Sequence, residues 1–215
     1  MTSLNQPDTT QKAFALCGIA GPILFTILVI VEGLLRPGYS QVAQAISELG
    51  QVGTPNAILQ DANFVVTGFL LISFVVGLYR GIGRGRSATL GLALLLVFPV
   101  VLVLVGTIFP LPNPVHAPLS VAGFVVLLVS IFVLSIALRK DNRWKGYASY
   151  SLGTGVVSVG LLLIIIATGQ GVLAPWFGLM QRLFLAPAFL WIEALAIKLL
   201  ALSSRPMQAP QPQVA

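Results

Sequence analysis

The polar side chains that could do chemistry gather at the ends of apolar segments, on the side of the chain that carries almost no Lys or Arg. The set combines carboxylates, amides, one imidazole and two guanidinium groups. Ionisable groups next to membrane spans are costly to bury, so they often mark binding or reaction sites. The candidate ligand-binding residues are Arg36, Glu48, Gln60, Asn63, His116, Gln181 and Arg182.

One group of these residues has helical spacing. Its members follow one another at intervals of four, three and four residues, which places them on one face of a helix. A polar stripe that faced lipid would be costly, so the stripe is predicted to face other helices or a wet cavity. The stripe consists of Asn56, Gln60, Asn63 and Thr67.

Charged partners can be proposed for several of the candidates. Glu32 and Arg36 lie one helical turn apart and could pair directly. Arg182 could reach Glu48 or Asp61 across the bundle. Glu193 has no obvious cation at its depth in the last apolar segment. It is expected either to be neutral and bonded to a hydroxyl or to belong to a proton or ion path.

Six apolar segments must position these side chains. Each has about the 20 residues that a helix needs to cross a bilayer. They span residues 13–35, 54–79, 88–108, 119–138, 148–168 and 183–202. The composition, 57% hydrophobic and 8% charged, excludes a water-soluble surface, since soluble domains carry about 25% charged residues. The predicted fold is all-α, a polytopic bundle of six transmembrane helices.

The first connector is predicted to contain a short amphipathic helix. Its apolar residues, Val42, Ala45, Ile46 and Leu49, recur every three or four positions. Ser40 is the predicted N-cap of this helix and Gly50 its end. Thr54 and Pro55 then form the expected cap and first residue of the second span.

The distribution of basic residues predicts how the chain is threaded. Ten of the 12 Lys and Arg residues fall on one side of the spans and only Arg36 and Arg182 on the other. The positive-inside rule therefore predicts a multi-pass protein of the cell membrane with both termini in the cytoplasm. Trp144 and Tyr147 are expected in the aromatic belt at the cytoplasmic interface. Residues 1–12 and 203–215 are predicted to be flexible cytoplasmic segments around a transmembrane domain of residues 13–202.

The net charge of +6 does not indicate nucleic-acid binding, because the basic residues flank apolar spans. The chain has one histidine and one cysteine, Cys17, which are too few for a multi-histidine metal or haem site, so no cofactor is expected. The predicted partners are membrane lipids and, because six helices in 215 residues make a thin bundle, a second copy of the chain.

Several short motifs resemble those of a known family. They are Cys17-Gly18-Ile19-Ala20-Gly21-Pro22, Arg36-Pro37-Gly38-Tyr39-Ser40, Ile46-Ser47-Glu48-Leu49-Gly50, Asn63, Phe109-Pro110, His116 and Gln181-Arg182. The chain is similar over residues 14–202 to the bacterial and archaeal membrane family catalogued as domain of unknown function 998. The resemblance implies a six-helix bundle with polar positions at the outer connectors, and it implies no activity. Leu111-Pro112-Asn113 stands where that family would be expected to carry an acidic residue.

Three functions remain open from the sequence. The first is an outward-facing polar pocket for a lipid or small anionic ligand, in which Arg36 and Arg182 hold the anion and Gln60 and Asn63 orient it. The second is an intramembrane enzyme that acts on a lipid-like substrate. In it, His116 or Glu48 would be the general base and Arg182 would stabilise negative charge. The third is a structural or assembly subunit without a site of its own.

Overall fold

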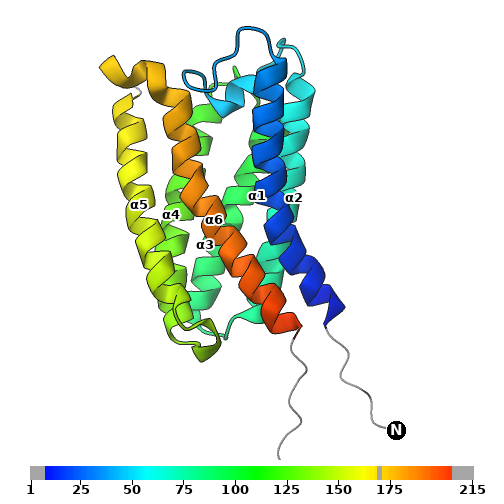
Figure 1. Ribbon diagram of the computed structural model, residues 1–215, viewed down its shortest axis with the longest axis vertical. Coiled ribbons are helices and arrows are strands. Elements are labelled where there is room, and N and C mark those ends of the chain that lie inside the picture. The colour runs from blue at the N-terminus through cyan, green and yellow to red at the C-terminus, as the bar shows by residue number, and fades with distance from the viewer. Residues whose placement is uncertain (1–7, 169–170, 205–215) are drawn as a thin grey trace, which may run out of the picture.

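The computed structural model describes residues 8–168 and 171–204 and places six long helices side by side (Figure 1). All six are long and apolar enough to cross a membrane, which confirms a multi-pass membrane protein. The long helices are α1 (Thr9–Leu35), α2 (Ala57–Gly81), α3 (Arg86–Thr107), α4 (His116–Arg139), α5 (Tyr147–Thr168) and α6 (Phe177–Ser203). Three short 3₁₀ helices lie in the connectors: η1 (Ile46–Gly50), η2 (Asn142–Trp144) and η3 (Gly171–Trp176).

The six helices form a closed ring. Each helix packs against the next in the sequence, and α6 returns to pack against α1. Large apolar side chains such as Leu152, Leu163 and Ile166 on α5 are exposed on the outside, where lipid would cover them. The interior of the ring is filled toward one end by fully buried side chains from several helices, among them Phe74, Leu134 and Trp191.

We call the end of the bundle formed by residues 80–86 and 139–145 the basic end, and the opposite end the η1 end. Figure 1 shows that α1 begins and α6 ends at the basic end. At the other end, the connector between α1 and α2 folds over the ring. A chain that starts and ends on the same side of a bundle must cross it an even number of times, in agreement with the six described helices.

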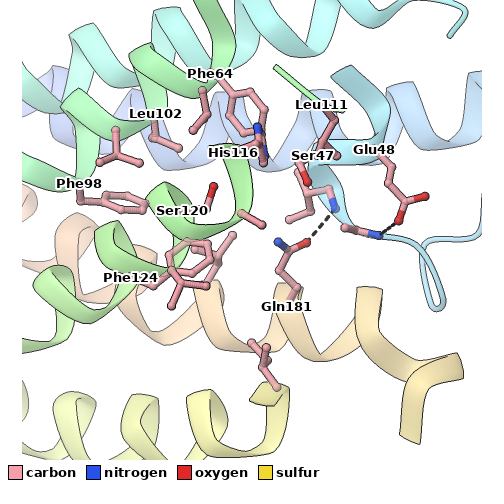
Figure 2. A pocket seen from close by; sticks show the side chains of 18 of the residues that line it. Ser47, Glu48, Phe64, Phe98, Leu102, Leu111, His116, Ser120, Phe124 and Gln181 are labelled. Carbon is pink, nitrogen blue, oxygen red and sulfur yellow. Dashed lines mark hydrogen bonds between the residues drawn. The ribbon is translucent and has the colours of Figure 1, made fainter. Parts of the chain in front are cut away.

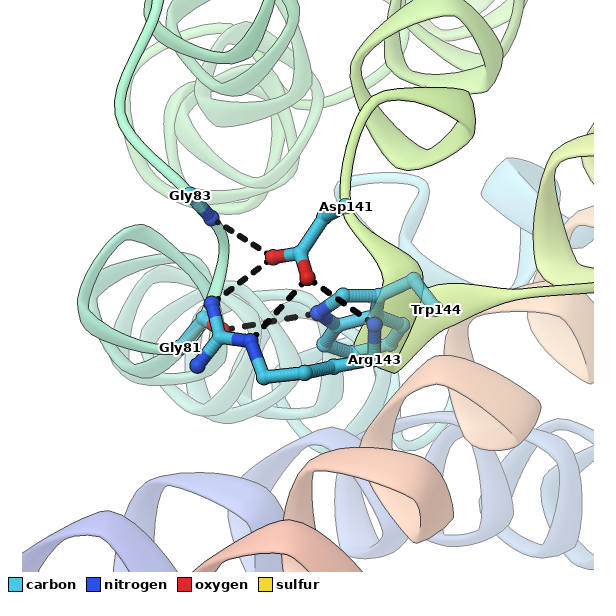
Figure 3. Close-up of polar contacts among 5 residues, drawn as sticks. All are labelled: Gly81, Gly83, Asp141, Arg143 and Trp144. Atoms are coloured by element: carbon cyan, nitrogen blue, oxygen red, sulfur yellow. Dashed lines mark hydrogen bonds and ion pairs between the residues drawn. The ribbon is translucent and has the colours of Figure 1, made fainter. Parts of the chain in front are cut away.

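A polar clamp joins the two turns of the basic end (Figure 3). The Asp141 carboxylate accepts hydrogen bonds from the Gly83 backbone amide at 3.0 Å and from the Arg143 guanidinium at 2.7 and 3.0 Å. The hydrogen bond from Arg143 holds the pKa of Asp141 below its ordinary value. Trp144 donates from its indole to the Gly81 carbonyl at 3.4 Å and is fully buried. Trp144 thus packs inside this end of the bundle, whereas the sequence analysis expected it in the aromatic belt at the interface.

The connector at the η1 end differs from the sequence prediction. A turn over residues 41–44 and the 3₁₀ helix η1 stand where one amphipathic helix was predicted. The Ser40 hydroxyl accepts from the Ala43 amide at 3.2 Å, which closes a turn instead of capping a helix. The Glu48 carboxylate accepts from the Ala45 amide at 2.8 Å, and this bond favours the tight 3₁₀ turn.

The second helix begins later than predicted. Asn56, with a φ of 63°, precedes α2, and the helix starts at Ala57. The Thr54 hydroxyl donates to the carbonyls of Leu49 and Gln51 and caps no helix. The first helix starts earlier than predicted, at Thr9, because the Asp8 carboxylate accepts from the Gln11 amide at 3.0 Å and caps it. Residues 1–7 and 205–215 of the predicted flexible segments lie outside the described residues.

Candidate functional site

The ring of helices encloses a cavity of about 430 Å³ in its η1 half (Figure 2). Small-molecule sites commonly have volumes of about 300–1,000 Å³. The walls are mainly apolar, and every long helix contributes to them, with Phe25, Phe64, Phe98, Phe124, Leu162 and Leu185 as examples. The cavity is therefore mainly apolar, whereas the sequence analysis predicted a polar pocket.

The polar lining is confined to the η1 side of the cavity. Five residues supply it, and Figure 2 shows them around the same space: Ser47, Glu48, His116, Ser120 and Gln181. They come from η1, from the first turns of α4 and from the first turns of α6. The cavity thus has an apolar body and a polar rim.

The first connector forms the roof of the cavity. Gln181 accepts a hydrogen bond from the Ile46 amide at 2.8 Å. The Leu179 amide donates to the Val42 carbonyl at 2.9 Å. Gly178 allows this close approach, because a Cβ atom at that position would overlap the carbonyl oxygen of Gln44. The seating of the connector on α6 thus depends on both hydrogen bonding and a missing side chain.

Two arginines hold the same connector and do not line the cavity. The Arg182 guanidinium donates to the Gln44 carbonyl at 3.1 Å and to the Tyr39 hydroxyl at 2.7 Å. Arg36 donates to the Glu48 carbonyl, and both guanidinium groups lie near the Tyr39 ring, at 5.5 Å for Arg36 and 5.8 Å for Arg182. Burial raises the pKa of the Tyr39 hydroxyl, an effect that the Arg182 hydrogen bond opposes.

The ion pairs expected for these arginines are wrong. Within the described part of the chain, neither Arg36 nor Arg182 forms a salt bridge to a carboxylate. Arg36 turns toward the Glu48 backbone instead of toward Glu32, since the connector folds back across the end of α1. Arg182 finds its acceptors in carbonyls and a phenol, because the connector and not Asp61 lies beside it.

His116 has a fixed ring orientation. Its Nδ1 lies 2.7 Å from the Phe109 carbonyl oxygen, and the residue is only 4% exposed. A carbonyl can only accept, so Nδ1 carries a proton, and in the neutral form of the ring Nε2 is the acceptor. Ser120 lies one helical turn further along α4 and lines the same cavity.

The Glu48 carboxylate is held within its own connector. One oxygen accepts from the Ala45 amide at 2.8 Å and the other from the Gln44 side-chain amide at 2.9 Å. Figure 2 shows this side chain pointing away from the middle of the cavity, so Glu48 lines the rim without turning its carboxylate inward. No Lys or Arg lies among the described residues that line the cavity.

The predicted polar stripe on α2 faces protein, as expected, except at its first member. Gln60, Asn63 and Thr67 are at most 1% exposed, whereas Asn56 is exposed ahead of the helix. The Asn63 amide donates to the Phe25 carbonyl of α1 at 3.3 Å. The stripe thus joins α1 to α2, outside the cavity lining.

The structure therefore divides the candidate residues into two groups. Glu48, His116 and Gln181 line the cavity, whereas Arg36, Gln60, Asn63 and Arg182 hold the surrounding elements together. Ser47 and Ser120 are additional lining residues. Ser120 could have been found from the sequence, because it lies one helical turn after His116. Ser47 could not, because its orientation depends on the path of η1.

Glu193 is partly buried on α6, and none of the described residues hydrogen-bonds its carboxyl.

Comparison with known families agrees with this architecture. The family model described as a protein of unknown function (DUF998) matches residues 19–198 of the chain. The chain belongs to this family. No curated protein and no solved structure matches the chain. The family description assigns no activity to its members, so function has to be argued from the cavity and its lining.

Proposed function

We propose that this DUF998 protein binds one lipid-like molecule, with an apolar chain and an uncharged hydrogen-bonding group, in the cavity between its helices. The observation that carries the proposal is the separation of the lining into an apolar body and a polar rim. A hydrocarbon chain in the body would gain about 25 cal/mol for each Å² of apolar surface removed from water. A ligand that is already in the bilayer does not leave water when it binds, so close packing against the aromatic walls would stabilise it instead.

The charges around the rim favour an uncharged polar group. No described lining residue is Lys or Arg, so the lining offers no cation to pair with a phosphate or carboxylate. The guanidinium groups of Arg36 and Arg182 are bonded to the connector. A ligand hydroxyl could donate to His116 Nε2 and accept from the Ser120 or Ser47 hydroxyl.

The test is lipid retention by two variants of α4. Ser120→Phe places a ring in the cavity, while Val129→Phe adds the same ring at a position that is 44% exposed on the outside. Lipids are extracted from protein purified in a mild detergent and identified by mass spectrometry. Wild type and Val129→Phe should retain one enriched neutral lipid, and Ser120→Phe should retain about tenfold less, equivalent to about 1.4 kcal/mol. Equal retention by all three proteins, or enrichment of an anionic phospholipid, would contradict the proposal.

A second candidate function is chemistry on that lipid. It is favoured by the fixed His116 ring, whose Nε2 is placed to act as a general base. In this case His116→Gln would abolish product formation from the copurifying lipid and leave its binding within about threefold. Product formation by His116→Gln at the wild-type rate would rule out this role.

We infer in addition that the basic end and both termini face the cytoplasm of the cell membrane. The positive-inside rule and the ten basic residues of that side support this orientation. In a Cys17→Ser background, an impermeant thiol reagent applied to intact cells should label Val52→Cys and spare Lys140→Cys. Labelling of only Lys140→Cys would reverse the orientation.

A further inference from the structure

The interface between α1 and α2 contains a carboxyl group without a protein partner. Glu32 lies one turn before the end of α1 and is 4% exposed. Both of its carboxyl oxygens are buried, and none of the described residues hydrogen-bonds them. This group lies outside the cavity lining, so the proposed lipid does not account for it.

The facing side of α2 presents amides. Gln60 is fully buried, and its side-chain nitrogen also lacks a hydrogen-bond partner in the described structure. Its oxygen accepts from the Asn63 amide at 3.4 Å, and the Thr67 hydroxyl donates to Asn63 at 3.2 Å. An unpaired amide donor and two unpaired carboxyl oxygens thus occur in one helix pair.

The charged groups on the packed elements leave Glu32 without a counterion. On α2, the nearby ionisable group is Asp61, whose charge has the same sign as that of Glu32 and interacts with it electrostatically. On the connector, Arg36 donates to the Glu48 carbonyl, and the Glu48 carboxylate is bonded to Gln44 and Ala45. On α6, Arg182 donates to Tyr39, Gln44 and Gly178.

A buried carboxylate without a cation or hydrogen-bond donors is strongly unfavourable. A proton would neutralise Glu32 without any further ligand, whereas a metal ion would need several oxygen ligands around it. No three His, Cys, Asp or Glu side chains cluster as a metal site among the described residues.

We propose that Glu32 is a proton-binding site inside the bundle, which holds a proton at low pH and releases it at high pH. Asp61 is partly exposed near the start of α2, and its carboxyl lies next to Gly50 of η1. The same two helices also line the cavity, through Phe25 of α1 and Phe64 of α2, whose ring centroids are 5.9 Å apart.

Infrared difference spectroscopy between about pH 5 and about pH 9 tests the proposal, since buried carboxyl groups can titrate in this range. Purified full-length protein should show a protonated-carboxyl band that is lost at high pH. Labelling all glutamates with carbon-13 in the wild-type protein should shift the band, which identifies Glu without any substitution. Glu32→Gln should remove the band, whereas Asp61→Asn, Glu48→Gln and Glu193→Gln should retain it.

Three results would overturn the proposal: a band insensitive to glutamate labelling, a band retained in Glu32→Gln, or a band lost in Glu193→Gln or Glu48→Gln. The absence of any pH-sensitive carboxyl band would also overturn it. The lipid-retention experiment on Ser120→Phe is independent, so the failure of one proposal leaves the other in place.

Discussion

Replacing Gly178 by alanine should detach the roof of the cavity. Gly178 lies on the second position of α6, against the carbonyl oxygens of Gln41 and Gln44. An added Cβ would overlap backbone atoms, which cannot rotate away as a side chain can. The connector must therefore move off α6 in Gly178→Ala.

The magnitude follows from the hydrogen bonds that depend on this contact. Four hydrogen bonds join the connector to α6. The Ile46 amide donates to Gln181, the Leu179 amide donates to the Val42 carbonyl, and Arg182 donates to the Gln44 carbonyl and to the Tyr39 hydroxyl. Each hydrogen bond contributes about 0.5–1.5 kcal/mol. If the substitution breaks two of the four, the connector loses about 1–3 kcal/mol of its binding to α6. Amide exchange over residues 42–46, followed by mass spectrometry, should then accelerate by about 5–150-fold, because local opening becomes easier by that amount.

The matched control is Gly153→Ala on α5, where a Cβ would meet no atom within 4 Å. It should leave exchange over the connector unchanged and stabilise α5 by up to about 1 kcal/mol. Wild-type exchange rates over residues 42–46 in Gly178→Ala would refute the reasoning about the roof.

Two further substitutions test the packing at the basic end and between α5 and α6. Asp141→Asn should lower stability by about 0.2–1 kcal/mol at neutral pH, since the Arg143 guanidinium is half exposed. Because the folded pKa of Asp141 is lowered, the wild-type advantage is present above its ordinary value of 3.8 and is lost as the pH falls below it, which thermal unfolding at several pH values measures. An advantage unchanged at low pH would contradict this. Ser151→Ala should cost about 1–3 kcal/mol, because it removes the acceptor of the fully buried Trp191 indole at 2.8 Å. The exposed Ser149→Ala should cost much less, and equal losses would contradict the assignment.

The helices and the buried stripe could be predicted from the sequence because both depend on local periodicity. Each apolar run has the length of a membrane span, and the spacing of Gln60, Asn63 and Thr67 places them on one face whatever they pack against. The prediction was wrong for the first member of that stripe, because Asn56 adopts a left-handed conformation before the helix starts.

The partners of the polar side chains could not be predicted, because they depend on how the first connector folds. Carbonyl groups of a 3₁₀ turn compete with carboxylates for a guanidinium group, and spacing in the sequence does not show which is closer. Arg36 and Arg182 were therefore predicted to bind a ligand, although they hold the roof. The cavity itself depends on the closure of the ring between α1 and α6, which no local pattern indicates.

The most direct test of the lipid site is photo-crosslinking with a long-chain alcohol that carries a photoactivatable group in its chain. Peptide mapping by mass spectrometry should place crosslinks on the inner residues Phe124, Leu162 and Leu185. Crosslinks confined to outward-facing residues such as Leu152 and Leu163 would contradict a lipid inside the ring.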